Sequence, residues 1–109
     1  MNHKIVYTPK ALHDLDDIWD YISLELDNPD AAAKIVTGIM DQIDALAFFP
    51  EMGTALSPLM EDENHYRFLI CGQYMAFYRV DGGIICIDRV LYGKRDYLNM
   101  LFPDDSASE

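Results

Sequence analysis

Five cations in the second half of the chain are the residues best suited to bind an anion. They are Arg67, Arg79, Arg89, Lys94 and Arg95. A guanidinium binds a phosphate or a carboxylate through two parallel hydrogen bonds, so these side chains could contact an acidic peptide or a nucleic-acid backbone. Lys94 and Arg95 directly follow an apolar run, where a strand would leave the core. We predict that these five cations contact a protein partner or target, although Lys94 and Arg95 could instead balance nearby carboxylates.

Three of these residues, Arg67, Arg79 and Arg89, interrupt predicted strands. A solvent-exposed strand face would explain them without any function. Gathered on that face, however, they would form a cationic strip suited to an acidic peptide or a phosphate backbone. The choice depends on strand register, which the sequence does not fix.

Catalytic candidates are few. A metal-free nuclease needs a general base, a general acid and cations beside the ribose 2′-OH. Tyr92 or Tyr97 could donate the proton, and Arg67 and Arg95 could stabilise the developing charge. No Ser/His/Asp or Cys/His arrangement and no glycine-rich phosphate loop is present. The sequence therefore gives catalysis only weak support.

No metal or other cofactor is expected. The three histidines are scattered along the chain, and neither a CxxC nor an HExxH spacing occurs. Cys71 and Cys86 both lie in apolar stretches, so we expect two small buried hydrophobic side chains in a reducing compartment.

The charge is distributed unevenly over a chain whose net charge is −11. Residues 11–63 carry thirteen acidic residues against Lys34 alone, a sum of −12, whereas residues 64–97 carry five cations against three aspartates, a sum of +2. An acidic surface repels phosphate at long range, so direct contact with nucleic acid is expected only locally, in the C-terminal half. Neither a run of eighteen apolar residues nor a signal-peptide pattern appears, which predicts a cytoplasmic protein without membrane contact.

Two helices are predicted in the first half, after a short strand at residues 4–7. Thr8 followed by a proline is a helix start signal, and apolar residues at helical spacing continue it over residues 9–26. A second start signal at residues 27–30 opens a helix that ends before Pro50. The short link predicts an antiparallel helical hairpin.

Three strands are predicted in the second half, at residues 66–71, 73–80 and 84–91, after a loop at residues 50–64. Alternation places Tyr74, Ala76 and Tyr78 on one face and Met75, Phe77 and Arg79 on the other; in the last strand Ile85, Ile87, Arg89 and Leu91 would share a face. The order β-α-α-β-β-β predicts an α+β fold, with the hairpin packed on a mostly antiparallel sheet. We expect one domain over residues 1–102 and a disordered polar tail at residues 103–109.

The order of several short motifs resembles the RelE/ParE family of toxins from bacterial type II toxin–antitoxin modules. These motifs are "YTPKALHDLDDIWDYI", "FFPEMG", "YRFLICGQYMAFYRV" and "IDRVLYGKRDY". The resemblance implies a plasmid-stabilisation-like toxin in a hetero-oligomer with a cognate antitoxin, whose C-terminal segment wraps the helices and the sheet. RelE-like members cut mRNA on the ribosome without a metal, whereas ParE-like members inhibit DNA gyrase.

Departures from the RelE-like pattern favour the ParE-like alternative. Tyr66 and Phe68 stand where RelE-like ribonucleases have lysines, Met75 replaces an arginine and Leu101 replaces a tyrosine; Arg95 alone is retained. Arg67, "YMAFYR" and "VLYGKRD" fit the ParE-like pattern. We therefore expect growth inhibition by protein–protein contact with DNA gyrase. The alternatives are a ribosome-dependent endoribonuclease or, because family toxins are usually basic, a degenerate binding module without toxicity.

The first prediction concerns the closing motif. Arg95→Ala should weaken growth inhibition without unfolding the domain, because the guanidinium is assigned to binding and not to the core. Growth after induced expression, with circular dichroism of the purified variant, measures both. An intact fold with unchanged toxicity would contradict this role for Arg95.

Overall fold

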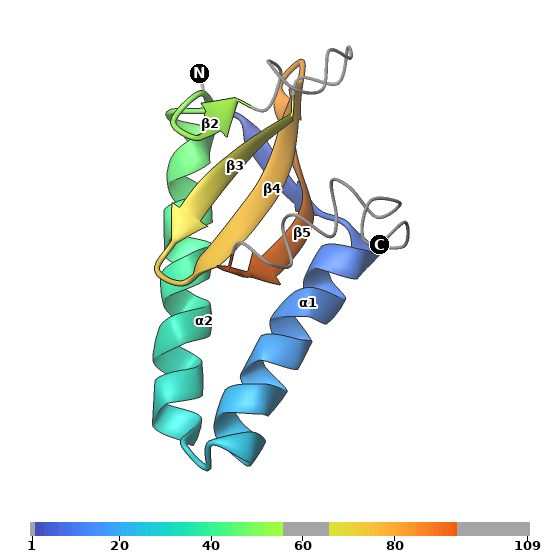
Figure 1. Cartoon of the computed structure of the whole chain (residues 1–109). Coiled ribbons are helices and arrows are strands. Elements are labelled where there is room, and N and C mark those ends of the chain that lie inside the picture. Colours follow the sequence, from blue (N-terminus) through green and yellow to red (C-terminus); the bar gives the residue numbers. More distant parts are fainter. Residues whose placement is uncertain (1, 56–65, 94–109) are drawn as a thin grey trace, which may run out of the picture.

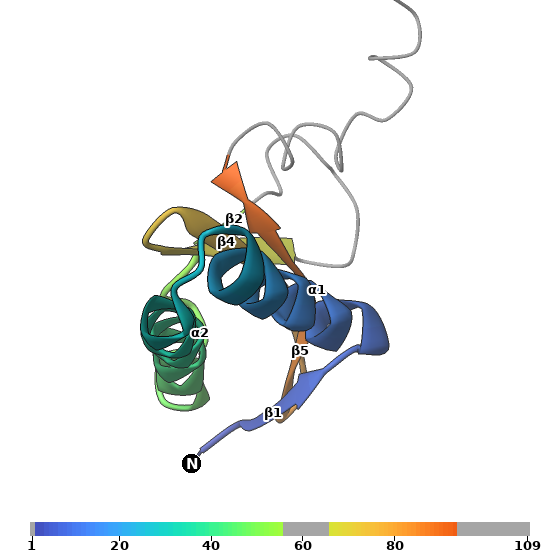
Figure 2. The ribbon, with the colours of Figure 1, turned by 90° about the horizontal axis from the view of Figure 1, so that it is seen from below.

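The computed structural model describes residues 2–55 and 66–93 and confirms the predicted α+β fold (Figure 1). Five strands form one sheet in the order β1-β5-β4-β3-β2; β1 and β5 are parallel and the other pairs are antiparallel. The strands are β1 (Lys4–Tyr7), β2 (Thr54–Ala55), β3 (Tyr66–Cys71), β4 (Tyr74–Asp81) and β5 (Ile84–Tyr92). The helices α1 (Pro9–Asp20) and α2 (Pro29–Asp44) lie side by side on one face of the sheet (Figure 2).

Both helices begin at the predicted residues. The Oγ1 atom of Thr8 accepts a hydrogen bond from the Ala11 N–H at 3.0 Å, and Oδ1 of Asn28 accepts one from the Ala31 N–H at 3.1 Å. A proline follows each cap at the first helical position, where a missing N–H costs no hydrogen bond. The predicted helix over residues 9–26 is α-helical only to Asp20, because a π-helical turn (Tyr21–Glu25) completes it.

The core lies between the helices and the sheet. Buried isoleucines form one cluster with Ile85 and Ile87 of β5, among them Ile22 of the π-helical turn and Ile39 and Ile43 of α2. The alternation predicted for β4 is confirmed. Tyr74, Ala76 and Tyr78 belong to this core. Met75 and Phe77 form a smaller cluster on the opposite face, where the rings of Phe68 and Phe77 lie 6.1 Å apart.

The predicted facing of β5 is wrong beyond Ile87. The partner of Tyr78 is Ile87, but the partner of Phe77 is Arg89, so Asp88 is the extra residue of a β-bulge. Val90 therefore joins Ile85 and Ile87 in the core, in place of Arg89. Alternation over the strand could not reveal the bulge, because a bulge shifts the side chains after it by one residue.

Three further expectations differ from the structure or fall outside it. The predicted loop over residues 50–64 contains the short edge strand β2. Cys71 is buried as predicted, but Cys86 is only half-buried. Lys94, Arg95 and the tail at residues 103–109 lie outside the described residues.

The outer edge of β5 is covered by three successive elements. β1 pairs with Ile84 to Ile87, and the Thr8 N–H then donates to the Ile87 carbonyl at 3.0 Å. Further along, the Asp14 carboxylate of α1 accepts a hydrogen bond from the Val90 N–H at 2.9 Å. The same carboxylate binds Nε and Nη2 of Arg89 at 2.8 and 2.9 Å. Asp14 thus ties α1 to the strand where β1 no longer reaches it.

We predict that Asp14→Ala lowers the free energy of unfolding by about 2–3 kcal/mol, because it leaves a buried N–H and a partly buried guanidinium without their acceptor. Urea denaturation monitored by circular dichroism measures the loss. Asp16→Ala is the matched control, since Asp16 is exposed on the same helix and its removal should change stability by less than about 0.5 kcal/mol. Equal losses in the two variants would contradict this role of Asp14.

Candidate functional site

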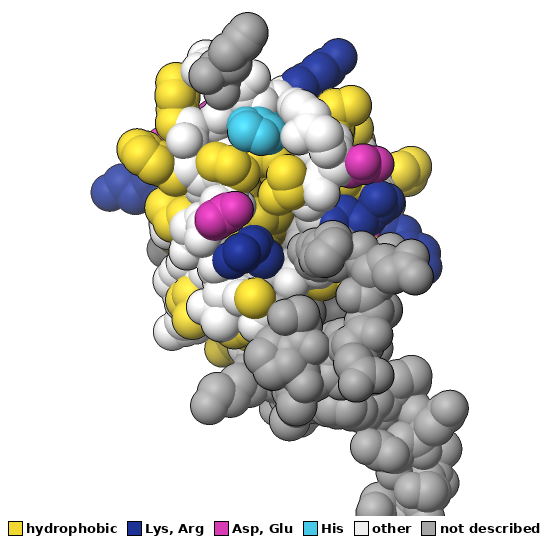
Figure 3. Space-filling view, turned by 90° about the horizontal axis from the view of Figure 1, so that it is seen from above, with side chains coloured by type: hydrophobic (Ala, Val, Ile, Leu, Met, Phe, Trp, Pro, Cys, Tyr) yellow, Lys and Arg dark blue, Asp and Glu magenta, His cyan; other side chains and the backbone are white. Residues whose placement is uncertain are grey.

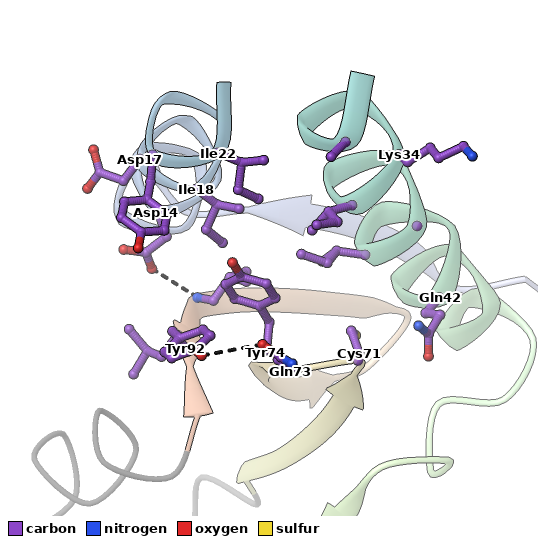
Figure 4. A pocket seen from close by; sticks show the side chains of 18 of the residues that line it. Asp14, Asp17, Ile18, Ile22, Lys34, Gln42, Cys71, Gln73, Tyr74 and Tyr92 are labelled. Atoms are coloured by element: carbon purple, nitrogen blue, oxygen red, sulfur yellow. Dashed lines mark hydrogen bonds between the residues drawn. The ribbon is translucent and has the colours of Figure 1, made fainter. Parts of the chain in front are cut away.

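A groove with a volume of about 1030 Å³ opens between the two helices and the sheet. The helices extend beyond the end of the sheet (Figure 1), so their facing sides are left partly uncovered there. The turn between β3 and β4 and the end of β5 form the other wall. In Figure 4, Ile18 of α1 and Ile22 of the π-helical turn that follows it point into this space, toward Tyr74.

The groove lining is mainly apolar and is exposed to solvent. Tyr21, Leu26 and Tyr92 are each more than half exposed, and Ile35 is 37% exposed. A contiguous apolar surface of this kind marks a contact site for another molecule. Sequence periodicity did not reveal it, because the same stripe on each helix also supplies the core.

Tyr92, predicted as a proton donor, lies at the groove end of β5. Its ring meets that of Tyr74 edge to face, with centroids 5.3 Å apart, and its hydroxyl donates to Oε1 of Gln73 at 3.3 Å. Burial, reinforced by the neighbouring Tyr92 and Tyr21, raises the pKa of Tyr74. Tyrosines with this ring packing provide an apolar contact surface with polar tips.

Cys71 also lines the groove, where its thiol is buried. Burial raises the pKa of its thiol to about 11, so the thiol stays protonated at neutral pH, and only the thiolate is reactive. Among residues 2–55 and 66–93, no three His, Cys, Asp or Glu side chains come close enough to share a metal ion.

The charged residues of the lining stand on opposite flanks. Asp14 is paired with Arg89. Asp17 points outward from α1 and Lys34 outward from α2 (Figure 4). Nε2 of His13 lies 3.6 Å from Oδ2 of Asp17, and both side chains are well exposed. The groove therefore has an apolar floor between a carboxylate on one rim and an ammonium on the other.

The three arginines that the structure describes do not share one face. Arg67 pairs with Tyr78, and its Nη1 donates to the Gly53 carbonyl at 2.8 Å. Arg89 bends toward α1 and Asp14. Arg79 lies on the opposite face, where its Nε is 3.4 Å from Oδ2 of Asp88. Strand register places Arg67 opposite the core residue Tyr78, whereas Arg89 pairs with Phe77 and reaches α1 through its side chain. Sequence alternation could not predict either arrangement.

Arg67 belongs to a set of contacts that holds the segment before β2 against the sheet. The buried Tyr78 hydroxyl accepts from the Gly53 N–H and donates to the Pro50 carbonyl, both at 2.9 Å. A Cβ atom on Gly53 would lie 2.5 Å from that hydroxyl oxygen and 2.6 Å from the Phe68 carbonyl oxygen. Only glycine fits there, which explains the glycine of the "FFPEMG" motif.

A polar cluster that the sequence did not indicate lies on the face opposite the helices. The Tyr66 hydroxyl donates to Asp88, which also accepts from Arg79 and lies 3.6 Å from the Cys86 Sγ. Burial and the bond to Asp88 raise the pKa of Tyr66, and the Asp88 carboxylate raises that of Arg79. Asp88 reaches these partners because it is the extra residue of the bulge. Strand alternation therefore could not predict the cluster.

A second apolar surface lies at the end of the molecule that carries the N-terminus, where hydrophobic side chains gather (Figure 3). Phe48 and Phe49 are 63% and 64% exposed, and Met52 is 47% exposed. They follow α2 in the segment after the 3₁₀ turn Ala45–Ala47.

In the described part of the chain, no helix is long and apolar enough to cross a bilayer.

Comparison with known proteins gives one family and several similar chains. Residues 5–97 match the model for the "ParE toxin of type II toxin-antitoxin system, parDE". The protein "Putative toxin Y4kP" of Sinorhizobium fredii (strain NBRC 101917 / NGR234) is 48% identical over 50 residues. These residues are 46% of this chain and 50% of that protein, so the chain matches about half of this relative's length.

A solved structure agrees with the fold. A chain of the "Chromosomal ParDE TA system from P. aeruginosa" is 29% identical and superposes with a TM-score of 0.70, over 84% of this chain and 97% of that one. A chain of the toxin–antitoxin complex RelBE2 from Mycobacterium tuberculosis is 20% identical, with a TM-score of 0.49 over 84% and 99% of the two chains. The family model matches residues 5–97, which is most of the chain. The chain therefore belongs to the ParE toxin family of type II toxin–antitoxin systems.

Proposed function

We propose that this protein is a growth-inhibiting toxin that acts in the cytoplasm by binding DNA gyrase, and that a cognate antitoxin neutralises it by occupying the groove. The family match supports the toxin assignment. The similar Pseudomonas aeruginosa chain belongs to a ParDE system, which supports an antitoxin partner for this chain as well. The exposed apolar groove is the surface that such a partner would cover.

The proposal that the antitoxin occupies the groove rests mainly on Gly38. It lies inside α2, where glycine costs about 1 kcal/mol of stability relative to alanine. A Cβ atom at this position would meet no other atom within 4 Å, so packing within the chain does not require glycine. Gly38 lines the groove. The missing side chain lets a partner approach the helix backbone closely.

The arginine contacts speak against RNA cleavage. Arg67, Arg79 and Arg89 bind carbonyl or carboxylate groups of their own chain. Tyr66, which stands where RelE-like ribonucleases have a lysine, donates a hydrogen bond from its hydroxyl to Asp88. These groups serve the fold, whereas cleavage needs cations directed at the developing charge of the substrate.

Growth after induced expression, with and without the adjacent small gene, tests the proposed function. We expect arrest that the neighbouring product relieves, together with loss of gyrase supercoiling activity when purified toxin is added to purified gyrase. Unaffected supercoiling with newly cleaved mRNA ends would replace gyrase inhibition with endoribonuclease activity. Normal growth with soluble, folded protein would contradict toxicity in that host.

The groove assignment predicts a separate result. Gly38→Leu should lower the amount of chain that co-purifies with the tagged neighbouring product at least tenfold, because the new side chain occupies the space assigned to the antitoxin. Thr37→Leu is the matched control, since Thr37 is exposed on the same helix and does not line the groove. Equal recovery of the two variants would place the antitoxin elsewhere.

A further inference from the structure

We propose that the side of α1 turned away from the groove binds the toxin's protein target, and that the target presents arginine or lysine side chains to it. We call this side the outer α1 face; it consists of Leu12, Asp16, Trp19 and Asp20. The inference rests on the proposed function and assigns to the target a surface that the antitoxin does not occupy.

The outer α1 face follows from helix geometry. Positions 12, 16 and 19 are spaced four and three residues apart, so their side chains lie along one side of the helix, and Asp20 is adjacent to them. Leu15 and Ile18 of the same helix are buried in the core. None of the four residues of the outer α1 face lines the groove. A target can therefore bind here while the groove stays open.

Two large hydrophobic side chains of this face are exposed to solvent. Leu12 is 49% exposed, and Trp19, the only tryptophan of the chain, is 41% exposed. Neither side chain belongs to the core cluster between the helices and the sheet. Tryptophan is among the residues whose truncation costs protein interfaces most affinity, because one ring buries a large apolar area. Trp19 thus offers a partner an apolar anchor.

The carboxylates of the outer α1 face carry charge that the chain itself does not neutralise. The other two aspartates of α1 differ, because Asp14 binds a guanidinium and Asp17 lies beside an imidazole. Asp16 and Asp20 are exposed and form no ion pair within residues 2–55 and 66–93. Both negative charges therefore remain available to a partner.

A tryptophan beside two such carboxylates is suited to bind a cation. The negative face of an indole attracts a guanidinium or an ammonium, and a carboxylate binds a guanidinium through two parallel hydrogen bonds. Asp16 precedes Trp19 by about one helical turn, and Asp20 follows it directly. The outer α1 face therefore complements a surface that carries arginine or lysine.

Two other occupants match this face poorly. A second copy of the chain would bring a net charge of −11 and the same carboxylates, so like charges would meet. A nucleic acid would bring its phosphates against Asp16 and Asp20. A basic protein surface is the occupant that both the carboxylates and the indole favour.

Charge reversal tests the outer α1 face. Asp16→Lys combined with Asp20→Lys should weaken binding of the full chain to purified gyrase, the proposed target, about tenfold, because two attractions become repulsions. The matched control, Asp41→Lys combined with Asp44→Lys, makes the same change of net charge at exposed residues of α2 that do not line the groove. It should change the affinity less than about threefold. Surface plasmon resonance gives the affinities, and growth after induced expression is measured for the same variants.

Truncation of the ring tests the apolar anchor. Trp19→Ala should weaken gyrase binding about tenfold, whereas Leu24→Ala should change it less than about threefold. Leu24 is the matched control because its side chain is 74% exposed and lies in the π-helical turn that follows α1. All of these variants should still co-purify with the tagged neighbouring product, and circular dichroism checks that they fold.

The wild-type chain tests the proposed function, and the variants test the inference. Equal affinity and equal growth arrest of a variant and its matched control would overturn the outer α1 face. Loss of co-purification by a folded variant of this face would also overturn it, because target and antitoxin would then share one surface. Arrest without gyrase binding would name another target, and the growth of the variants then decides the inference. A wild-type chain that neither binds gyrase nor arrests growth fails the proposed function, and the inference fails with it.

Discussion

The Asp14 carboxylate is the contact on which the relation of the helices to the sheet depends. β1 is four residues long, so it leaves the second half of β5 with an open edge. Asp14 accepts the Val90 N–H there and holds the Arg89 guanidinium at the same time. One side chain thus satisfies a backbone donor and a partly buried cation, both of which would otherwise be costly to bury.

The groove follows from a difference in length. α2 spans sixteen residues, about 24 Å at 1.5 Å per residue, and both helices run past the end of the sheet (Figure 1). The apolar stripe of each helix continues beyond the strands that cover it, so part of it has no partner within the described residues. Apart from Asp14, the acidic residues of residues 9–44 are exposed, so the field around the hairpin is negative.

The contacts of the arginines differ from the binding role that family resemblance implies. The resemblance implies that these arginines bind a partner, yet the described ones contact Gly53, Asp88 and Asp14 of their own chain. Two of these contacts join separate elements, because Arg67 holds the residues before β2 and Arg89 holds α1, whereas Arg79 and Asp88 lie on neighbouring strands. A cation in a short motif can therefore be retained for the fold as readily as for binding, and only its partners distinguish the two.

Local patterns sufficed for much of this protein. The caps at Thr8 and Asn28 placed the helix starts, alternation gave the two faces of β4, and the order of elements gave the α+β class. These features depend on residues close together in the chain, so the sequence by itself determined them. Other features depend on segments up to 76 residues apart. They are the bulge at Asp88, the pairing of Arg89 with Asp14, the close packing of Gly53 against Tyr78, and the groove. Only the tertiary structure decided them, because strand register and helix length relative to the sheet are set by packing and not by local pattern.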